Sequence, residues 1–224
     1  MNKSLPLLNE KVTKCELCPR LVKYRESVEP RKAFRDQTYW KKPVPGFGDP
    51  KAQLLIIGLA PSAHGGNRTG RIFTGDLSGD FLFKALYQEG FANQALSRDK
   101  NDGLELMNAY ITAAVKCAPP NNKPTALEKR TCFQYLTQEM RLLSNVKAIL
   151  TLGRFAFEAY LDFLKSVGQN VKGLTFEHGK KYHFENAPFL FCAYHPSPQN
   201  TNTGKLTMQQ FCAVLRGLNA FLRK

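Results

Sequence analysis

Short apolar runs alternate with segments of helical periodicity along most of the chain. The runs are typical of buried strands and occupy residues 53–59, 109–117, 146–153 and 188–198. Apolar residues at three- to four-residue spacing predict helices over 77–90, from Thr125 onward, after residue 153 to about Lys165, and over 206–224. Thr125-Ala-Leu-Glu also has the form of a capping box. This alternation predicts an α/β fold with a mostly parallel sheet that helices cover on both faces.

The first fifty residues lack this regularity, and there we expect one short helix around Cys15 and Cys18. Residues 41–50 hold three prolines and two glycines, which predicts a loop. Residues 174–185 predict a β-hairpin that turns near His178 and Gly179. The length of 224 residues suits a single domain, with about residues 1–50 as an N-terminal segment.

Three polar segments follow the first, second and fourth predicted strands. They read GLAPSAHGGNRTGRIFTGD, KCAPPNNKP and HPSPQNTNTG. In parallel sheets of this kind, ligands bind outside the C-terminal ends of the strands. We therefore expect the functional site at the edge of the sheet where these three segments meet.

The charge of the chain narrows the class of partner. Lys and Arg number 32 against 18 for Asp and Glu, which gives a net charge of +14. A field of that sign attracts polyanions, and contacts with phosphate supply most non-specific affinity for DNA. The charge therefore favours a nucleic-acid partner over a basic protein without one. No apolar run is long enough to span a membrane, and the N-terminus is too polar for a signal peptide, so we expect a cytoplasmic protein with no membrane partner.

Four of the six cysteines form a candidate metal site. Cys15 and Cys18 make a CxxC pair, and Cys117 and Cys132 lie about a hundred residues later. Four thiolates bind zinc or an iron–sulfur cluster, and the wide gap between the second two favours the larger group. The alternative is four unrelated thiols. The other two cysteines, which lie in apolar runs, are expected to pack in the core.

The cysteine pattern and the three polar segments together resemble the uracil-DNA glycosylase superfamily, specifically its type-5, or B-type, branch. The resemblance runs from Cys15 to about residue 207. It implies a three-layer αβα sandwich with a short, mainly parallel central sheet and a [4Fe–4S] cluster on the four cysteines. It also implies that the partner is DNA containing deaminated bases. The enzyme would flip uracil out of the DNA and hydrolyse its N-glycosidic bond, with hypoxanthine and xanthine as further substrates. We expect a monomer.

The resemblance also assigns catalytic residues. Asp76 is the working carboxylate, which would stabilise positive charge on the sugar and orient water. The alternative is that Asp76 only caps the next helix. Asn122 would hold water or the base, unless it is an ordinary turn residue. His195 would donate a hydrogen bond to the departing base, unless it is a hydrogen-bonded surface histidine.

Other residues are expected to contact the base or the DNA backbone. Phe73 would stack on the flipped base, or else it belongs to the core. Related branches carry polar residues at the positions of Leu59 and Ala113, so the pocket should be less selective for uracil. The expected pocket residues are Gly58, Leu59, Ala60, His64, Phe73 and Ala113. The expected DNA contacts are Arg68, Arg71, Ser197, Asn200 and Thr203, with exposed backbone N–H groups of residues 65–71 as further phosphate donors.

Two other functions remain open. A non-catalytic DNA-binding module with a structural metal site would share the charge and the cysteines, but it leaves Phe-Thr-Gly-Asp and His-Pro-Ser-Pro without a purpose. A nucleotide hydrolase would use the glycine-rich segment for phosphate, and turnover of free nucleotides would distinguish it from an enzyme that acts on DNA.

Overall fold

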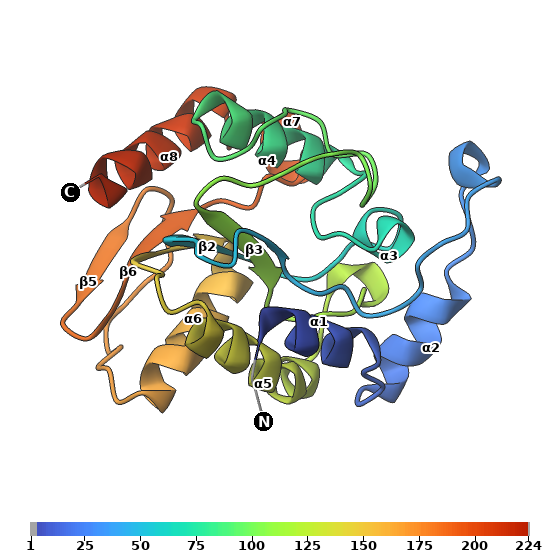
Figure 1. Ribbon diagram of the computed structural model, residues 1–224, viewed down its shortest axis with the longest axis horizontal. Coiled ribbons are helices and arrows are strands. Elements are labelled where there is room, and N and C mark those ends of the chain that lie inside the picture. Colours follow the sequence, from blue (N-terminus) through green and yellow to red (C-terminus); the bar gives the residue numbers. More distant parts are fainter. Residues whose placement is uncertain (1–3, 224) are drawn as a thin grey trace.

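The computed structural model describes residues 4–223, which form a central six-stranded sheet (Figure 1). The strand order is β1-β3-β2-β4-β6-β5. The four central strands are parallel, and both edge strands pair antiparallel. The predicted mostly parallel sheet is therefore confirmed, and the C-terminal ends of its central strands share one edge. The strands are β1 (Phe47–Gly48), β2 (Leu54–Gly58), β3 (Ala109–Ala113), β4 (Ala148–Leu152), β5 (Lys181–Phe184) and β6 (Ala187–Ala193).

Helices cover both faces of this sheet, as Figure 1 shows, with α4 and α8 on one side and α5 and α6 on the other. A hydrophobic core lies on each face of the sheet, between the strands and the helices. Side chains of β2 alternate between these two cores, because successive residues of a strand point to opposite faces. Leu54 and Ile56 pack under α4 and α8, whereas Leu55 and Ile57 pack under α5 and α6. The αβα layering is thereby confirmed. The four helices are α4 (Leu77–Gln88), α5 (Ala126–Leu142), α6 (Arg154–Ser166) and α8 (Met208–Leu222).

Capping residues set the starts of the two long helices. Thr125 and Glu128 form the predicted capping box of α5, in which each side chain accepts a hydrogen bond from the other residue's backbone N–H. Thr207 and Gln210 form a second box at α8. Glu128 also pairs with Arg20, at 2.7 Å from Nε to Oε1, and this ion pair joins the N-terminal segment to α5.

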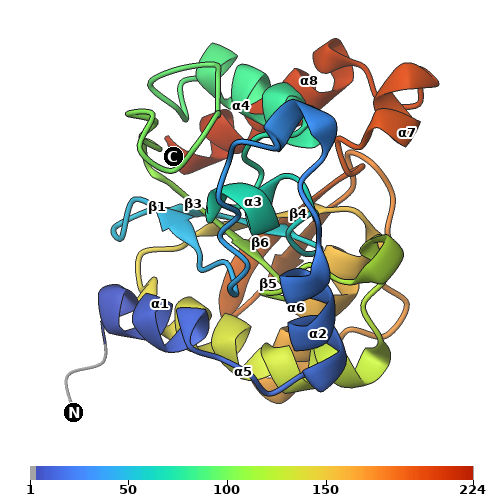
Figure 2. The same ribbon diagram turned by 90° about the vertical axis from the view of Figure 1, so that its right-hand side faces the viewer.

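The N-terminal segment contains α1 (Leu5–Thr13), α2 (Pro19–Ser27) and the 3-10 helix η1 (Lys32–Phe34), and Figure 2 shows α1 and α2 beside α5. The expectation of one helix around the CxxC pair is wrong, because Cys15 and Cys18 lie in the connection between two helices. Pro19 has no backbone N–H to donate and is tolerated only in the first turn, so the second helix begins there.

Other boundaries also differ from expectation. The loop over 41–50 contains the short edge strand β1. The second strand ends at Ala113, opposite Gly58 where β2 also ends. The hairpin turns at residues 185–186, between β5 and β6, rather than near His178 and Gly179. The polar segments contain short helices, namely α3 (Gly66–Thr69), η2 (Pro120–Asn122) and α7 (Pro198–Asn202).

Membrane-crossing helices are absent from residues 4–223: none of the helices there combines the necessary length and apolar character.

Candidate active site

A cleft of about 1070 Å³ opens beside the C-terminal ends of the central strands. Its wall includes the segment after β2, the first turn of α4, η2 after β3 and the start of α7 after β6. Residues 24–37 and 96–99 complete it from two other parts of the chain. Four of the predicted site residues line this one cleft, namely His64, Arg68, Asp76 and Asn122. The three polar segments therefore meet, as expected.

The carboxylate of Asp76 is fixed by both of its oxygens. Oδ1 accepts the backbone N–H of Gly79 at 2.9 Å, which makes Asp76 the N-cap of α4. Oδ2 accepts the hydroxyl of Ser62, and that hydroxyl accepts the backbone N–H of Gly65 at 3.0 Å. Asp76 thus caps the helix and lines the cleft at once. The two interpretations of this residue are compatible.

Gly65 allows the Asp76 carboxylate to lie this close to the chain. A Cβ atom at position 65 would be 2.2 Å from Oδ2 of Asp76 and 2.4 Å from Oγ of Ser62. Any larger residue would therefore push the carboxylate away from its two donors. The glycine-rich sequence serves close packing here.

His195 lies immediately after β6, with its ring 5.6 Å from that of Phe73 between centroids. Burial lowers the pKa of His195, and the charge of Asp76 acts against this effect. The imidazole is therefore neutral at pH 7 and carries one N–H donor. Asn200 holds the loop, since its Nδ2 donates to the carbonyl of His195 at 2.8 Å.

Phe73 packs over the end of β2. Its side chain is 7% exposed and belongs to the same core as Ala113. A Cβ at Gly58 would lie 2.6 Å from the ring, so only glycine fits beneath it. This burial agrees with the alternative of a core phenylalanine. Its backbone has a φ of 52°, a strained left-handed value that is rare for bulky residues and often marks functional sites.

Leu59 and Ala60 continue from Gly58 as half-buried residues without polar side chains. Ala60 packs against the cysteine cluster described below. This short segment therefore lies between the end of β2 and the cysteines.

Asn122 reaches the cleft from a tight turn. Asn121 and Asn122 both adopt left-handed backbone conformations, with φ of 54° and 55°. Asparagine tolerates this region better than most residues, which explains the Pro-Pro-Asn-Asn sequence. His64 contacts Tyr39, with 3.0 Å between Nδ1 and the phenol oxygen. Burial lowers the pKa of His64, and the nearby charges of Arg31 and Arg68 lower it further.

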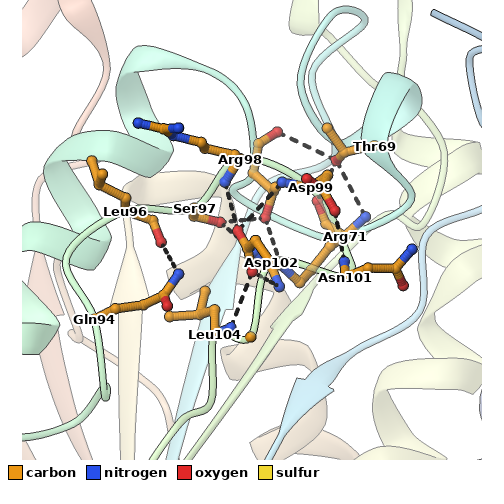
Figure 3. A network of polar contacts seen from close by, with 12 residues as sticks. Thr69, Arg71, Gln94, Leu96, Ser97, Arg98, Asp99, Asn101, Asp102 and Leu104 are labelled. Atoms are coloured by element: carbon orange, nitrogen blue, oxygen red, sulfur yellow. Dashed lines mark hydrogen bonds and ion pairs between the residues drawn. The ribbon is translucent and has the colours of Figure 1, made fainter.

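The expected phosphate contact of Arg71 is wrong. Its side chain is 4% exposed, and its guanidinium pairs with Asp102 at 2.9 and 2.7 Å (Figure 3). The remaining bonds go to Thr74 and Ser97. A buried guanidinium whose three nitrogens all donate within the protein has no means to reach DNA.

Arg68 and the glycine-rich segment also need correction. Arg68 lines the cleft, but its guanidinium donates to the carbonyls of His64 and Gly75 and to Gln37. Most backbone N–H groups of residues 65–71 bond within α3 and its flanks rather than facing solvent. The segment therefore folds as a compact turn of helix, and the expected phosphate cradle is not formed.

The residues after His195 lie in α7 and its caps. Ser197 is the N-cap of α7, and its hydroxyl makes no capping bond. Thr203 is exposed and donates to the carbonyl of Gln199 at 2.7 Å. DNA contacts by Ser197, Asn200 and Thr203 stay a prediction.

The four cysteines of the candidate metal site line one small cavity, although they come from three separate parts of the chain. Cys15 and Cys18 lie between α1 and α2, Cys117 lies after β3, and Cys132 lies on α5. Among residues 4–223, no three Cys, His, Asp or Glu side chains are grouped so as to hold a single metal ion. Cys192 and Cys212 are buried in the core, as expected.

Cationic and N–H donors surround these sulfurs. Arg25 is 3% exposed, and its Nη1 lies 3.3 Å from Sγ of Cys117. The backbone N–H of Lys116 donates to Sγ of Cys132 at 3.2 Å. Burial raises the pKa of Cys117 to about 11 and that of Cys132 to about 12. The thiols alone are therefore neutral, whereas a bound metal would deprotonate them.

Comparison with known proteins decides the family. Residues 45–219 match the family model described as the uracil DNA glycosylase superfamily. The chain belongs to this superfamily. It is 49% identical over 205 residues to the type-5 uracil-DNA glycosylase of Thermus thermophilus, which covers 91% of this chain and 92% of the relative.

Further relatives agree at the level of the branch. The type-5 uracil-DNA glycosylase of Mycobacterium leprae is 49% identical over 216 residues, 95% of this chain and 93% of the relative. A type-4 uracil-DNA glycosylase of Sulfurisphaera tokodaii is 30% identical over 214 residues, 93% of this chain and 82% of the relative. The superfamily match begins at residue 45, so it includes Asp76, Asn122 and His195 but not Cys15 and Cys18.

Two acidic residues that shape the site were not predicted from the sequence: Asp80, which lines the cleft, and Asp102, which lies behind it. Asp80 lines it one helical turn after Asp76, and partial burial and the charge of Asp76 raise its pKa. The repeated Gly-Asp of Phe-Thr-Gly-Asp-Leu-Ser-Gly-Asp was the available signal, since residues four apart share a helix face. Asp102, which binds Arg71 across 31 positions, had no such signal.

Proposed function

We propose that this member of the superfamily is a monofunctional DNA glycosylase that hydrolyses the N-glycosidic bond of uracil in DNA. One observation carries the proposal: Asp76 presents a carboxylate, fixed by both oxygens, in the cleft beside the sheet edge. The relatives named type-5 uracil-DNA glycosylases support the substrate. A non-catalytic DNA-binding module would account for the four cysteines but not for the fixed carboxylate in the cleft, and a nucleotide hydrolase would need the phosphate cradle that residues 65–71 do not form.

Asp76 would act on the sugar. When the bond breaks, its electron pair leaves with the base, and positive charge develops at C1′. A carboxylate held beside that carbon stabilises the charge and orients the water that adds there. Each carboxylate oxygen of Asp76 has a second lone pair, so the bonds to Gly79 and Ser62 leave capacity for water.

His195 and Asn122 would act on the base and the water. A neutral imidazole donates a hydrogen bond to the base oxygen on which negative charge collects. Asn122, which lines the same cleft as Asp76, holds water or the base edge. Phe73, whose ring lies beside that of His195, would support the base from the end of β2.

The range of bases follows from apolar residues at the ends of β2 and β3. Leu59, Ala60 and Ala113 offer no side-chain hydrogen bonds that would select uracil. Recognition of the base would then depend on the shape of the pocket and on the hydrogen bond from His195. Such a pocket would also accept larger deaminated bases. We therefore extend the proposal to hypoxanthine and xanthine in DNA.

We also propose that Cys15, Cys18, Cys117 and Cys132 hold a [4Fe–4S] cluster, which would supply structural cross-linking rather than a step of the reaction. All four cysteines line one cavity, so a single group bound there would contact all four sulfurs. Four cysteine thiolates are the usual ligands of a [4Fe–4S] cluster. The buried positive charge of Arg25 and the N–H of Lys116 suit anionic sulfurs. The cluster would tie residues 1–50 to β3 and α5 within a single domain.

Two measurements test these proposals. The purified protein is expected to produce abasic sites in synthetic duplexes that contain uracil, hypoxanthine or xanthine, and Asp76→Asn should lose most of this activity. Undiminished activity of Asp76→Asn would refute the assigned role.

For the cluster, a brown protein whose visible absorption fades on reduction is expected, and a colourless protein that contains zinc would refute it. Monomeric state and cytoplasmic location stay predictions.

A further inference from the structure

Two arginines of the cleft wall have side chains that the protein itself does not use. Arg31 precedes η1, and Arg98 lies in a loop over residues 94–104, here called the 94–104 loop. Both are exposed and both line the cleft. Within residues 4–223, neither guanidinium takes part in an ion pair or a hydrogen bond. Their hydrogen bonds are made by the backbone: the N–H groups donate to Tyr39 and to Asp102, and the Arg31 carbonyl accepts the N–H of Phe34. This distinguishes them from Arg68 and Arg71.

The acidic neighbours of Arg98 are already occupied. Asp102 accepts from Arg71 and from the backbone N–H groups of Arg98 and Leu104, at 2.7 to 3.0 Å. Asp99 accepts the backbone N–H of Asn101 at 2.8 Å. Figure 3 shows the Arg98 side chain directed away from this network. The loop is thus held by its own carboxylates, while the Arg98 guanidinium remains available.

The other arginine contributes to a positive region of the cleft. The charges of Arg31 and Arg68 both lower the pKa of His64, so all three lie near one another. Arg68 is bonded internally, and His64 is engaged with Tyr39. Arg31 is therefore the member of this group whose donors are free. The acidic groups of the cleft are Asp76 and Asp80, at the start of α4, and Asp99, whose carboxylate accepts the backbone N–H of Asn101.

We infer that Arg31 and Arg98 bind phosphate groups of the DNA strand that flank the extruded nucleotide. The inference rests on the proposed function, which places the sugar of that nucleotide against Asp76 in the same cleft. Its phosphates are then the nearest anions to the cleft wall. A guanidinium offers a planar fork of donors that matches phosphate geometry, and it stays charged at every working pH.

The test is the salt dependence of DNA binding. The probe is a duplex with one 2′-fluoro-2′-deoxyuridine, whose glycosidic bond resists hydrolysis. Each phosphate contact contributes about 0.9 to the slope of log affinity against log salt concentration. Arg31→Gln and Arg98→Gln are each expected to reduce the slope by about 0.9, and the double variant by about 1.8. When the salt concentration rises fourfold, the DNA affinity of a variant that lacks one contact should therefore fall by a factor about 3.5 times smaller than the factor for the wild type.

Controls separate a local contact from the general charge of the protein. Arg141→Gln removes an exposed arginine on α5 that is outside the cleft, and it should leave the slope nearly unchanged. Arg98→Lys keeps the charge and should restore the slope. Excision of uracil by Arg31→Gln and Arg98→Gln should fall at low protein concentration and recover at saturation.

Two results would overturn the inference: an unchanged slope in both cleft variants, or an equal reduction in Arg141→Gln. These binding measurements do not depend on turnover. If the wild-type protein excised no base, the proposed function would fail, while the slopes would still decide whether the two arginines contact phosphate.

Discussion

Asp102 fixes the 94–104 loop, and replacing it with asparagine tests how much that contact stabilises the protein. The carboxylate pairs with the buried guanidinium of Arg71 and accepts three backbone N–H groups of its own loop (Figure 3). Arg71 in turn bonds to Thr74 and Ser97, beside the segment that carries Asp76. Asp102→Asn keeps the shape of the side chain and removes its charge.

The magnitude follows from the pKa of Asp102. Burial alone would raise it, but the hydrogen bonds from Arg71 and from the backbone outweigh burial and lower the pKa from 3.8 to about 2. At about 1.36 kcal/mol per pH unit, this fall corresponds to about 2.4 kcal/mol at pH 7. Leaving buried Arg71 without a counter-charge costs about 3–5 kcal/mol in comparable cases. We expect Asp102→Asn to lower the free energy of unfolding by about 3 kcal/mol.

Urea unfolding at several pH values provides the assay. Because the pKa is lower in the folded state, the stabilisation is present above about pH 3.8 and is lost as the pH falls through about 2. The difference in free energy of unfolding between the wild type and the variant should therefore be about 1 kcal/mol smaller at pH 3 than at pH 7. Asp99→Asn, in the same loop but without an arginine partner, is the matched control. The reasoning would be refuted if Asp102→Asn and the wild type had the same free energy of unfolding at pH 7, or if the difference between them did not change with pH.

Two further predictions concern the reaction itself. Gly65→Ala should lower the rate of uracil excision by about 100-fold, because the added methyl would displace the Asp76 carboxylate by about 1 Å. A circular dichroism spectrum like that of the wild type would confirm that the variant keeps its fold. An excision rate equal to that of the wild type would contradict the prediction. The excision rate should stay nearly constant as the pH falls from about 8 to 7, because burial lowers the pKa of His195 below its ordinary value of 6.5 and the neutral form predominates throughout this range. Single-turnover rates that already halve at pH 7 would argue against this assignment.

The parts of the fold that the sequence predicted are those with a strong local pattern. β2, β3 and β4 are buried on both faces, so each is a continuous apolar run with a clear signature. The hairpin was misplaced because His178-Gly179 has a typical turn glycine, while the true turn at 185–186 has none. A turn does form at His178-Gly179, where the N–H of Lys180 donates to the carbonyl of Glu177 at 3.3 Å, but it precedes β5 and does not connect the two strands of the hairpin. Local turn chemistry does not specify which of two candidate turns the sheet register selects.

The candidate site divides in the same way. Asp76 and Asn122 could be expected near each other, because the segments that follow parallel strands emerge at one edge of the sheet. The role of Arg71 could not be predicted, since an arginine in a glycine-rich segment looks the same whether it faces DNA or a buried carboxylate. Only the fold brings Asp102 to it. Arg31 and Arg98, the two cleft arginines whose guanidinium groups have no partner among residues 4–223, lie outside every motif that the sequence offers.

Asp76 shows why capping and catalysis need not compete for one side chain. The cap uses one oxygen, Oδ1, and the first turn of α4 then holds the whole carboxylate in a single orientation. Ser62 fixes the second oxygen, so the group enters the reaction already positioned and loses little conformational freedom when the sugar arrives. An aspartate that only capped the helix would need neither Ser62 nor a glycine at position 65. Those two neighbours are the structural argument that this carboxylate is built for more than starting a helix.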